Sequence, residues 1–526
     1  IDDSFFDRGG HSLLAMRLMA RIHRTFGKSV ALRSLFKGPS VRFLSDALAG
    51  AEDVRAEAIA RADRRPGATL PLSIAQQRLW TLFEVEPEAA VAYSNGLWWR
   101  LVGHLDTTAL ARAASEIVRR HEALRGGFRL GAEAGEALTL VAHQPVEISF
   151  ASTSEGASAI ADWASAETKR PFDLERGPLL RVSVLRLGDD DHAVLLVLPH
   201  IVSDGWSMGV VIKEMNQLYG AFVRGEASPL PELRVQYADY AAWQRRGHDH
   251  ARMQRQVAHW QAHLEGAPPA FDIPTDRARP THRTYAAAYH RWLLPLALKQ
   301  RLEALSEAHG ATLFMTLLSG IGLWLTRHSG QQEIVIGVPI ASRGHPDLEP
   351  LIGYFINVMP LRIDLRGSPS FAELIERTKD VALSGYANAD VSYEKIEEAI
   401  HPPWDPSRTP VFQVIFVFHN TPRPSLDWPG LAVAAVDESD RPASKVDLHI
   451  QMIETDGRLW TELEYNPDLF DAATIARMAE RLEVVLESVV ADPRLRADDV
   501  PLCPHHEASL VLDGWSGHVA RPEAFR

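Results

Sequence analysis

The sequence predicts an α/β protein in which a small helical unit precedes two α/β halves. Three observations support this prediction. An amphipathic stripe lies within residues 1–50, strand-like and helix-like segments alternate from 71 to about 500, and two apolar runs, 192–200 and 334–338, are typical of buried strands. A chain of 526 residues is too long for one hydrophobic core, so three or four compact units are expected.

Residues 1–50 are predicted to form helices. Apolar residues recur every four positions and form one helical stripe: Leu14, Leu18, Ile22 and Phe26. This helix is expected to end at Gly27, and a second short helix is expected over 41–48. Residues 51–70 show little apolar pattern and are interpreted as a linker that is partly helical.

The first α/β half is expected over residues 71–245. Ser73 with Gln76 three residues later has the spacing of a capping box, so a helix should begin there. Further helices are predicted over 107–121 and 206–222, with the buried strand 192–200 between them.

The second half is expected over residues 246–500. It contains a proline-rich extended stretch over 268–280 and several predicted elements: helices over 298–309, 312–328 and 469–490, and strands over 334–338 and 411–418. The last residues, 501–526, show no such pattern and are interpreted as a linker into a further domain.

Composition excludes several classes of protein. A net charge of −13 without a basic run argues against nucleic-acid binding. Cys503 is the only cysteine, which excludes an intramolecular disulfide and favours a reducing, cytoplasmic location. No apolar run is long enough to suggest a membrane span. The start at Ile1, without an initiator methionine or signal peptide, indicates an excised piece of a longer protein.

Gly9-Gly10-His11-Ser12 precedes the first predicted helix. Two glycines allow a tight turn, and Ser12 then lies at the helix N-terminus, where free N–H groups favour a phosphate ester. The same pattern also fits a serine that only caps the helix. A serine hydrolase is not indicated, because the G-x-S-x-G turn and a preceding strand are missing.

The segment Pro199-His200-Ile201-Val202-Ser203-Asp204-Gly205 joins the buried strand to the next helix. His200 stands at this corner, and a neutral imidazole can take up a proton near pH 7. Gly205 is placed to turn its N–H toward an oxyanion. The alternatives are a histidine bonded only to the backbone and an aspartate, Asp204, that serves as the helix cap. A metal site would need a third ligand that the sequence does not place.

The string from Asp3 to Leu13 resembles the peptidyl carrier proteins of nonribosomal peptide synthetases. In that family the serine of the GGxS motif carries 4′-phosphopantetheine, and Ser12 matches that position. The resemblance covers about 50 residues and lacks the family's first helix, which would precede Ile1. It implies that a phosphopantetheinyl transferase modifies the chain.

Residues 71 to about 500 resemble a condensation domain, a relative of chloramphenicol acetyltransferase. Seven family motifs occur in order: 73–80, 120–128, 199–205, 237–243, 352–358, 388–394 and 405–410. The resemblance implies two lobes in a V shape around a central tunnel. It divides the chain as follows: 1–50 carrier domain, 51–70 linker, 71–245 N-terminal lobe, 246–500 C-terminal lobe and 501–526 linker into an adenylation domain.

The resemblance also implies roles for individual residues. His200 matches the second histidine of HHxxxDG, which acts on the acceptor amine, and Asp204 matches the structural aspartate. We expect Arg343 to pair with Asp204. Other motif positions have mainly structural roles: Arg120, Arg125 and Trp243. The first histidine of the motif is Pro199 here, and because that position is supportive we expect activity to survive.

The function implied is peptide-bond formation between thioesters on an upstream and a downstream carrier domain. His200 acts either as a base or by positioning the amine, and the sequence leaves both open. The carrier reads directly into the condensation domain and carries Gly-Gly-His-Ser, which favours an L-configured donor residue. The alternative is a non-catalytic scaffold that docks carriers or tailoring enzymes. Two histidine clusters, 248–250 and 505–506, are interpreted as solvated surface.

Overall fold

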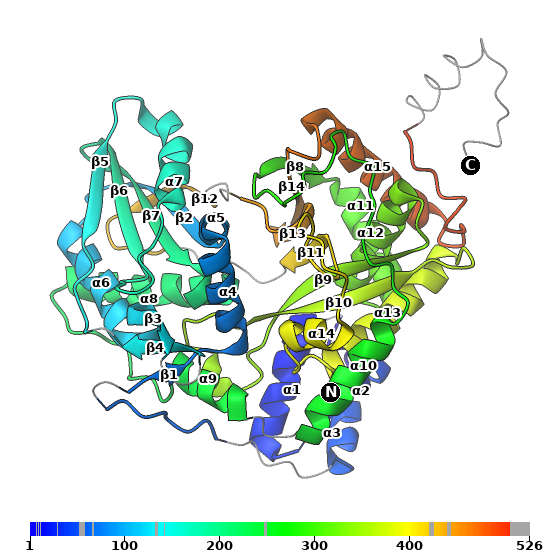
Figure 1. The fold of residues 1–526 in the computed structure, drawn as a ribbon, viewed down its shortest axis with the longest axis horizontal. Coiled ribbons are helices and arrows are strands. Elements are labelled where there is room, and N and C mark those ends of the chain that lie inside the picture. Colours follow the sequence, from blue (N-terminus) through cyan, green and yellow to red (C-terminus); the bar gives the residue numbers. More distant parts are fainter. Residues whose placement is uncertain are drawn as a thin grey trace.

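Two α/β lobes and a small helical unit make up the part of the chain that the structure describes (Figure 1). The structure is a computed structural model, and it describes residues 1–504 except 7, 9, 11, 29, 52–57, 66–67, 132–134, 141, 247–249, 420–425 and 439–442. The histidine cluster at 505–506, nearly all of the linker 501–526 and two residues of the cluster 248–250 therefore lie outside the described residues.

Three helices form the N-terminal unit: α1 (Ser12–Phe26), α2 (Leu32–Lys37) and α3 (Val41–Ala49). They enclose a small core of Ala15, Leu35 and Leu44, against which Leu18 and Ile22 pack. Phe26 does not continue the predicted stripe, because it ends the helix and is 57% exposed. The unit lies below the two lobes, with α2 against α13 (Phe371–Ala387) of the second lobe (Figure 1).

The N-terminal lobe is built on a five-stranded sheet of order β12-β2-β7-β6-β5, in which β12 is Ala432–Glu438, and a three-stranded sheet of order β1-β4-β3. Its strands are β1 (Leu70–Pro71), β2 (Ser94–Val102), β3 (Gly126–Gly131), β4 (Gly135–Leu140), β5 (Ile148–Ser152), β6 (Arg181–Gly188) and β7 (Asp191–Pro199). Its helices are α4 (Ile74–Val85), α5 (Pro87–Ala92), α6 (Thr107–Arg120), α7 (Ile160–Lys169), α8 (Gly205–Val223) and α9 (Tyr237–Arg246). The predicted capping box of Ser73 and Gln76 is present at α4.

The C-terminal lobe is built on a six-stranded sheet of order β10-β9-β11-β13-β14-β8. Its strands are β8 (Ala288–Leu294), β9 (Glu333–Ala341), β10 (Ile356–Asp364), β11 (Val414–His419), β13 (Leu448–Thr455) and β14 (Arg458–Tyr465). Its helices, besides α13, are α10 (His250–Leu264), α11 (Leu296–Ala308), α12 (Leu313–Ser329), α14 (Tyr393–Ile400) and α15 (Ala472–Ala491). The predicted helices and strands of this half all occur, with ends shifted by a few residues.

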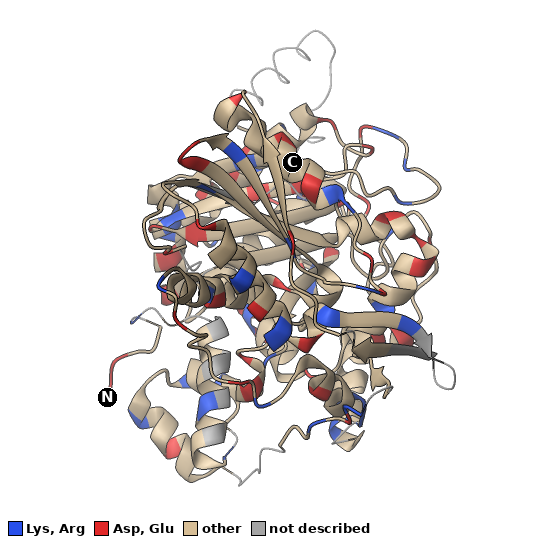
Figure 2. Cartoon of the chain, turned by 90° about the vertical axis from the view of Figure 1, so that its left-hand side faces the viewer, with Lys and Arg blue, Asp and Glu red and all other residues tan. Residues whose placement is uncertain are grey.

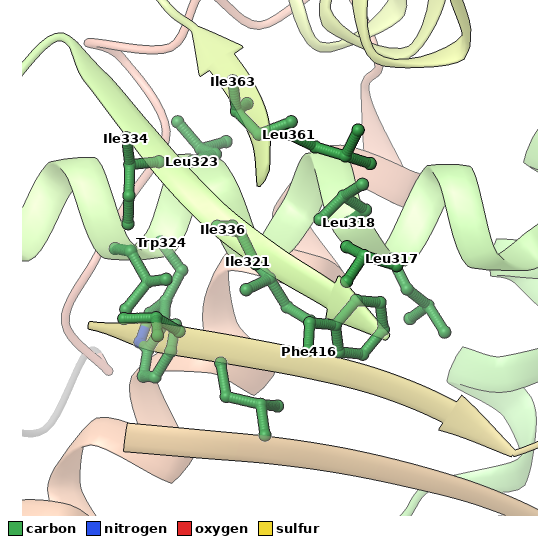
Figure 3. Packing of buried hydrophobic residues seen from close by; sticks show 14 of the residues in the cluster. Leu317, Leu318, Ile321, Leu323, Trp324, Ile334, Ile336, Leu361, Ile363 and Phe416 are labelled. Carbon is green, nitrogen blue, oxygen red and sulfur yellow. The ribbon is translucent and has the colours of Figure 1, made fainter. Parts of the chain in front are cut away.

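Helix α12 forms the centre of the second lobe. Figure 3 shows Leu317, Ile321 and Trp324 of this helix among side chains of β9, β10 and β11. The helix is apolar on all sides and buried from Phe314 to Thr326, as expected for a helix surrounded by protein. Among the described residues no single helix is long and apolar enough to cross a membrane, and only the bent pair α11–α12 passes by combined length and composition.

Two segments of the second half of the chain pack into the first lobe. The connection between β9 and β10 buries Leu348, Leu351, Ile352 and Phe355 in the N-terminal core. Strand β12 (Ala432–Glu438) pairs with β2 and forms the edge of the five-stranded sheet, while Leu426 and Trp428 are buried in the N-terminal core. The expected division at residue 245 therefore separates the lobes only in part. The sequence did not reveal this crossover, because an edge strand carries no mark of the sheet that it joins.

The linker is attached to the N-terminal lobe along its second half. Arg64 donates to Asp239 at 2.6 Å and to Glu122 at 2.8 Å, and the Ala62 N–H donates to the same Asp239 carboxylate at 2.6 Å. Ile59 is buried in the core of the lobe. The described residues 58–65 form neither helix nor strand, and residues 52–57 of the linker, on which the expectation of partial helix also rests, lie outside the described residues.

Candidate functional site

The site lies where strand β7 turns into helix α8. β7 ends at Pro199, His200 begins a short 3-10 turn, and α8 begins at Gly205. The turn is fixed from two sides: the His200 N–H donates to the Tyr93 carbonyl at 2.7 Å, and the Asp204 carboxylate accepts from the Ser207 N–H at 2.7 Å. Asp204 is therefore the cap that the sequence allowed, and the cap holds the corner rigid.

A cavity of about 4160 Å³ lies between the lobes and reaches this corner. Residues of the N-terminal lobe line it, among them His200 and Gly205, and Tyr354 lines it from the C-terminal lobe. Leu14 and Phe36 of the N-terminal unit line it as well. His200 is only 7% exposed, but that small exposed part borders a space large enough for substrates.

The imidazole of His200 is held between two tyrosines and two polar groups. The rings of Tyr93 and Tyr354 meet it edge to face at centroid distances of 6.0 and 5.9 Å. Nδ1 lies 3.1 Å from the Ser203 carbonyl oxygen and 3.3 Å from Asn95 Nδ2. A carbonyl oxygen can only accept, so a hydrogen bond to Ser203 places the ring hydrogen on Nδ1 and leaves a lone pair on Nε2, whereas a hydrogen bond from Asn95 Nδ2 places the ring hydrogen on Nε2.

Asp204 and Arg343 form a buried ion pair between the lobes. Arg343 Nη2 lies 3.2 Å from Asp204 Oδ1, and the Asp204 side chain is 1% exposed. The guanidinium also donates to the Leu348 and Leu351 carbonyls at 2.6 and 2.8 Å, and burial lowers its pKa. The structure thus places beside Asp204 the arginine that the sequence suggested, and Asp204 is occupied with donors rather than directed at a substrate.

Gly205 is exposed at the first position of α8 and lines the cavity. A Cβ added here would meet no atom within 4 Å, so open space lies directly over this backbone. The helix itself does not use the N–H groups of its first turn, and the positive end of the helix dipole faces the same way. The corner therefore combines a proton acceptor with a region that stabilises negative charge.

The other predicted site residues lie in the N-terminal lobe, and among them Arg120 lines the cavity. Arg120 donates to Glu214 at 2.9 Å, and His121 Nε2 lies 2.9 Å from the other oxygen of that carboxylate. Burial acts to raise the pKa of Glu214, but the hydrogen bond from His121 and the charge of Arg120 lower it overall. Arg125 and Trp243 are not among the described residues that line the cavity.

Several cavity residues were not singled out from the sequence. Arg78 of α4 bridges the lobes, with Nη2 3.2 Å from Glu397 and its guanidinium 4.9 Å from the centre of the Tyr393 ring. Tyr93 and Asn95 contact His200 but belong to no motif that we had identified. Tyr354 and Arg78 lie within the motifs 352–358 and 73–80, but the sequence did not show that their side chains line the cavity.

Ser12 is the first residue of α1, and the structure describes the backbone of this serine but not its side chain. A Cβ on Gly10 would lie 2.4 Å from the Phe5 carbonyl oxygen, so the turn before Ser12 requires glycine. Gly10 and Leu14 on either side of Ser12 line the cavity. A serine at a helix N-terminus beside the cavity fits a phosphate ester. No group of metal-ligating residues occurs among the described residues.

Comparison with known families assigns both parts of the chain. Residues 67–512 match the model of the condensation domain. The chain belongs to the condensation domain family. Residues 1–48 match the phosphopantetheine attachment site, so 4′-phosphopantetheine is the cofactor of the N-terminal unit. The two α/β lobes expected from the sequence are confirmed by this match and by the solved structures below.

Relatives of this condensation domain are synthetases. The chain is 37% identical over 525 residues, or 98% of its length, to one of the linear gramicidin synthase polypeptides of Brevibacillus parabrevis and covers 7% of that protein. It is 38% identical over 519 residues, or 97% of its length, to malpinin synthetase of Mortierella alpina and covers 7% of it. The chain thus spans about a tenth or less of the length of these relatives.

Solved structures share the fold. The X-domain from teicoplanin biosynthesis has a TM-score of 0.78 and 29% identity, covering 85% of this chain and 100% of that one. The first condensation domain of the calcium-dependent antibiotic synthetase, bound to a substrate analogue, has a TM-score of 0.71 and 22% identity, covering 84% of this chain and 100% of that one. The second similarity shows the fold alone.

Proposed function

We propose that this condensation domain forms a peptide bond between an acyl thioester on an upstream carrier and the amine of an aminoacyl thioester on a downstream carrier. One observation carries the proposal: His200 borders a cavity between the lobes that is also lined by residues on both sides of Ser12. Ser12 is the proposed attachment point, where a phosphopantetheinyl transferase would act. The arm would supply the thiol that carries the donor acyl group.

The residues at the corner account for the chemistry. The amine nitrogen attacks the thioester carbonyl carbon, and His200 Nε2 takes the proton that the nitrogen loses. The negative charge on the carbonyl oxygen lies toward Gly205 and the N-terminus of α8. The C–S bond then breaks, and the departing thiolate takes the proton. Because a thioester is already activated, alignment of the two substrates supplies much of the rate, at best about 7–11 kcal/mol.

The N-terminal unit is proposed to deliver the donor. It rests on the C-terminal lobe through Leu32 and Phe36, which pack against the core of that lobe, and through an exposed ion pair between Arg33 and Asp380. Residues 1–50 hold eight Lys or Arg against four Asp or Glu, whereas the whole chain has a net charge of −13. A basic carrier on an acidic body is electrostatically favourable. The downstream carrier and an adenylation domain are further proposed partners.

A dipeptide-forming assay with loaded carriers tests the catalytic role of His200. We expect His200→Ala to lower single-turnover condensation by about 10²–10⁴-fold, the contribution typical of general acid–base catalysis. His250→Ala is a matched control because His250 begins α10 on the exposed surface. Turnover of His200→Ala near that of the control would remove His200 from the chemistry.

A second candidate is a non-catalytic scaffold. It is favoured by the 28% identity and TM-score of 0.77 to the X-domain that was solved in complex with OxyB, covering 86% of this chain and 99% of that one. A scaffold predicts no condensation by the wild-type chain with any loaded carrier pair, so the same assay separates the two candidates.

We further propose that the donor residue is L-configured. This rests on the direct connection between the carrier and the condensation domain and on the Gly-Gly-His-Ser sequence around Ser12. Carriers loaded with L- and D-aminoacyl groups in direct competition should yield mainly the product of the L-form. A preference for the D-form would contradict the proposal.

A further inference from the structure

Two groups compete for one ring nitrogen of His200. The Ser203 carbonyl, 3.1 Å from Nδ1, can only accept a hydrogen bond, whereas the Asn95 amide nitrogen, 3.3 Å from the same atom, can only donate one. A neutral ring cannot satisfy both, because Nδ1 carries either a hydrogen or a lone pair. The contact that prevails decides which hydrogen-bonding group Nε2 offers.

The backbone fixes Asn95 beside the ring. In the ladder between β2 and β7, Asn95 lies opposite Leu198 and Ser94 lies opposite Pro199, one residue before His200. Tyr93, just before β2, and Asn95 in β2 both contact the His200 ring and line the cavity. The bond from the His200 N–H to the Tyr93 carbonyl at 2.7 Å holds the two segments together.

We propose that Asn95 is a positioning residue that selects the tautomer of His200. With Nδ2 toward the ring, Nδ1 accepts and the ring hydrogen lies on Nε2, which then donates. After a half-turn of the amide, the Asn95 oxygen joins the Ser203 carbonyl as a second acceptor, the hydrogen lies on Nδ1, and Nε2 can take a proton. The inference rests on the proposed function, since it assigns the two forms to two parts of that reaction.

Each form suits one part of the reaction. The form with a hydrogen on Nε2 can hold the lone pair of the incoming amine or donate toward the sulfur. The form with a lone pair on Nε2 takes the proton that the nitrogen loses as the C–N bond forms, and returns it to the thiolate as the C–S bond breaks. In the charged ring both nitrogens carry hydrogen, and the Asn95 oxygen with the Ser203 carbonyl then stabilises the one on Nδ1.

Titratable groups near the ring include Tyr93 before β2, Tyr354 before β10, and Asp204 at the cap of α8. Burial raises the pKa of both tyrosines, so they stay neutral across the working range. Asp204 is paired with Arg343, and Lys445 lies 4.5 Å from the centre of the Tyr93 ring. Beyond the tyrosines lie Arg78 and Glu394, which pair at 3.8 Å. Substitution of Asn95 alters none of these charges.

Nuclear magnetic resonance on ¹⁵N-histidine-labelled full chain reads the tautomer directly, without any substrate. The signal of His200 is assigned by its loss in His200→Gln. In the wild type we expect intermediate ¹⁵N shifts for Nδ1 and Nε2, because both forms are populated. In Asn95→Leu the Ser203 carbonyl is the remaining partner of the competing pair, so the Nε2 shift should move toward that of an unprotonated nitrogen.

Ser94→Ala is the matched control, because Ser94 is on the opposite face of β2 and donates to the Ala90 carbonyl. It should leave the His200 shifts as in the wild type. Identical shifts in the wild type and Asn95→Leu would overturn the proposal. This readout does not depend on condensation, so a wild-type chain without activity would defeat the proposed function and leave the tautomer result to be judged by itself.

Asn95→Asp supplies the second test. A carboxylate only accepts, so it should hold the hydrogen on Nδ1 and favour the charged ring, which raises the pKa of His200 by about one unit. The acid limb of the pH–rate profile should therefore move to higher pH by about one unit, and in Asn95→Leu it should not. An acid limb in Asn95→Asp at the wild-type position would also overturn the proposal.

Discussion

Arg343 is the residue on which the corner of the site most depends. Its guanidinium joins Asp204 and Ser207 to the Leu348 and Leu351 carbonyls of the connection between β9 and β10, which packs on the first lobe. The guanidinium carbon also lies 3.9 Å from the centre of the Phe355 ring. Loss of this side chain leaves a buried carboxylate without its cation. Such a loss affects the fold before it affects the chemistry.

Arg343→Ala should lower the free energy of unfolding by about 3–5 kcal/mol, the usual consequence of removing one partner of a buried ion pair. Arg494→Ala is the control, since that side chain is 88% exposed and its pair with Asp492 should contribute less than about 1 kcal/mol. Urea unfolding of both variants measures the difference. A loss in Arg343→Ala no larger than that of the control would show that the pair does not stabilise the interface.

At the scale of single residues, the sequence was informative where chemistry restricts the residue type. The pairing of Asp204 with Arg343 was expected from the resemblance to the condensation domain, and the two side chains meet in the structure. Asn95 was missed because the sequence around a strand asparagine does not show whether its side chain contacts a histidine ring or faces solvent. Its position follows from the register of β2 on β7, which only the folded sheet reveals.

Helices α6 and α8 are joined by one buried carboxylate. Glu214 of α8 accepts from Arg120 and from His121, at and just after the end of α6. Its pKa is lowered in the folded chain, despite burial, by the hydrogen bond from His121 and the charge of Arg120. Because the pKa is lower in the folded than in the unfolded chain, the carboxylate stabilises the fold at pH values above its pKa in the unfolded chain. This contribution is lost as the pH falls through its pKa in the folded chain.

We therefore expect the wild type to lose stability as the pH falls below 4.5, the ordinary pKa of a glutamate, and Glu214→Gln to be less stable at neutral pH but to lose less in this acidic range. Glu226→Gln is the control: the pKa of Glu226 is also lowered, by Arg224, but the side chain is at the surface. Thermal unfolding at a series of pH values measures both. Parallel curves for wild type and Glu214→Gln would contradict the assignment.

At the scale of elements, long periodic segments were predicted well. Helices α8 and α12 and strands β7 and β9 occur within a few residues of their expected positions, because burial imposes a strong apolar pattern. Seven helices of the described residues were not predicted: α2, α5, α7, α9, α10, α13 and α14. α2 has six residues, which is too short for a periodic signal.

For the whole molecule, the contact between the N-terminal unit and the C-terminal lobe predicts how the rate of transfer depends on ionic strength. The pair between Arg33 and Asp380 is exposed, so it should steer the unit rather than hold it firmly. Arg33→Glu should slow transfer from the N-terminal unit about fivefold at low ionic strength, which corresponds to roughly 1 kcal/mol. The effect should fade as salt screens the charges.

Arg33→Glu combined with Asp380→Arg should restore the rate, and Arg42→Glu should not change it, because Arg42 pairs with Asp2 inside the unit. Single-turnover rates across a salt series measure all four chains. A rate for Arg33→Glu that matches the wild type at low salt would place the productive contact elsewhere. Figure 2 shows Lys and Arg residues mixed with Asp and Glu residues along the elements in this view.

The strand β12 has a consequence for engineers who recombine such synthetases. A cut near residue 245 looks natural from the chain, but it would remove the edge of the five-stranded sheet together with Trp428, whose ring stacks on Tyr219 at 4.4 Å. In a chimera assembled from halves of different parents, β12 of one parent would have to pair with β2 of the other. The smallest exchangeable cassette is therefore both lobes taken together.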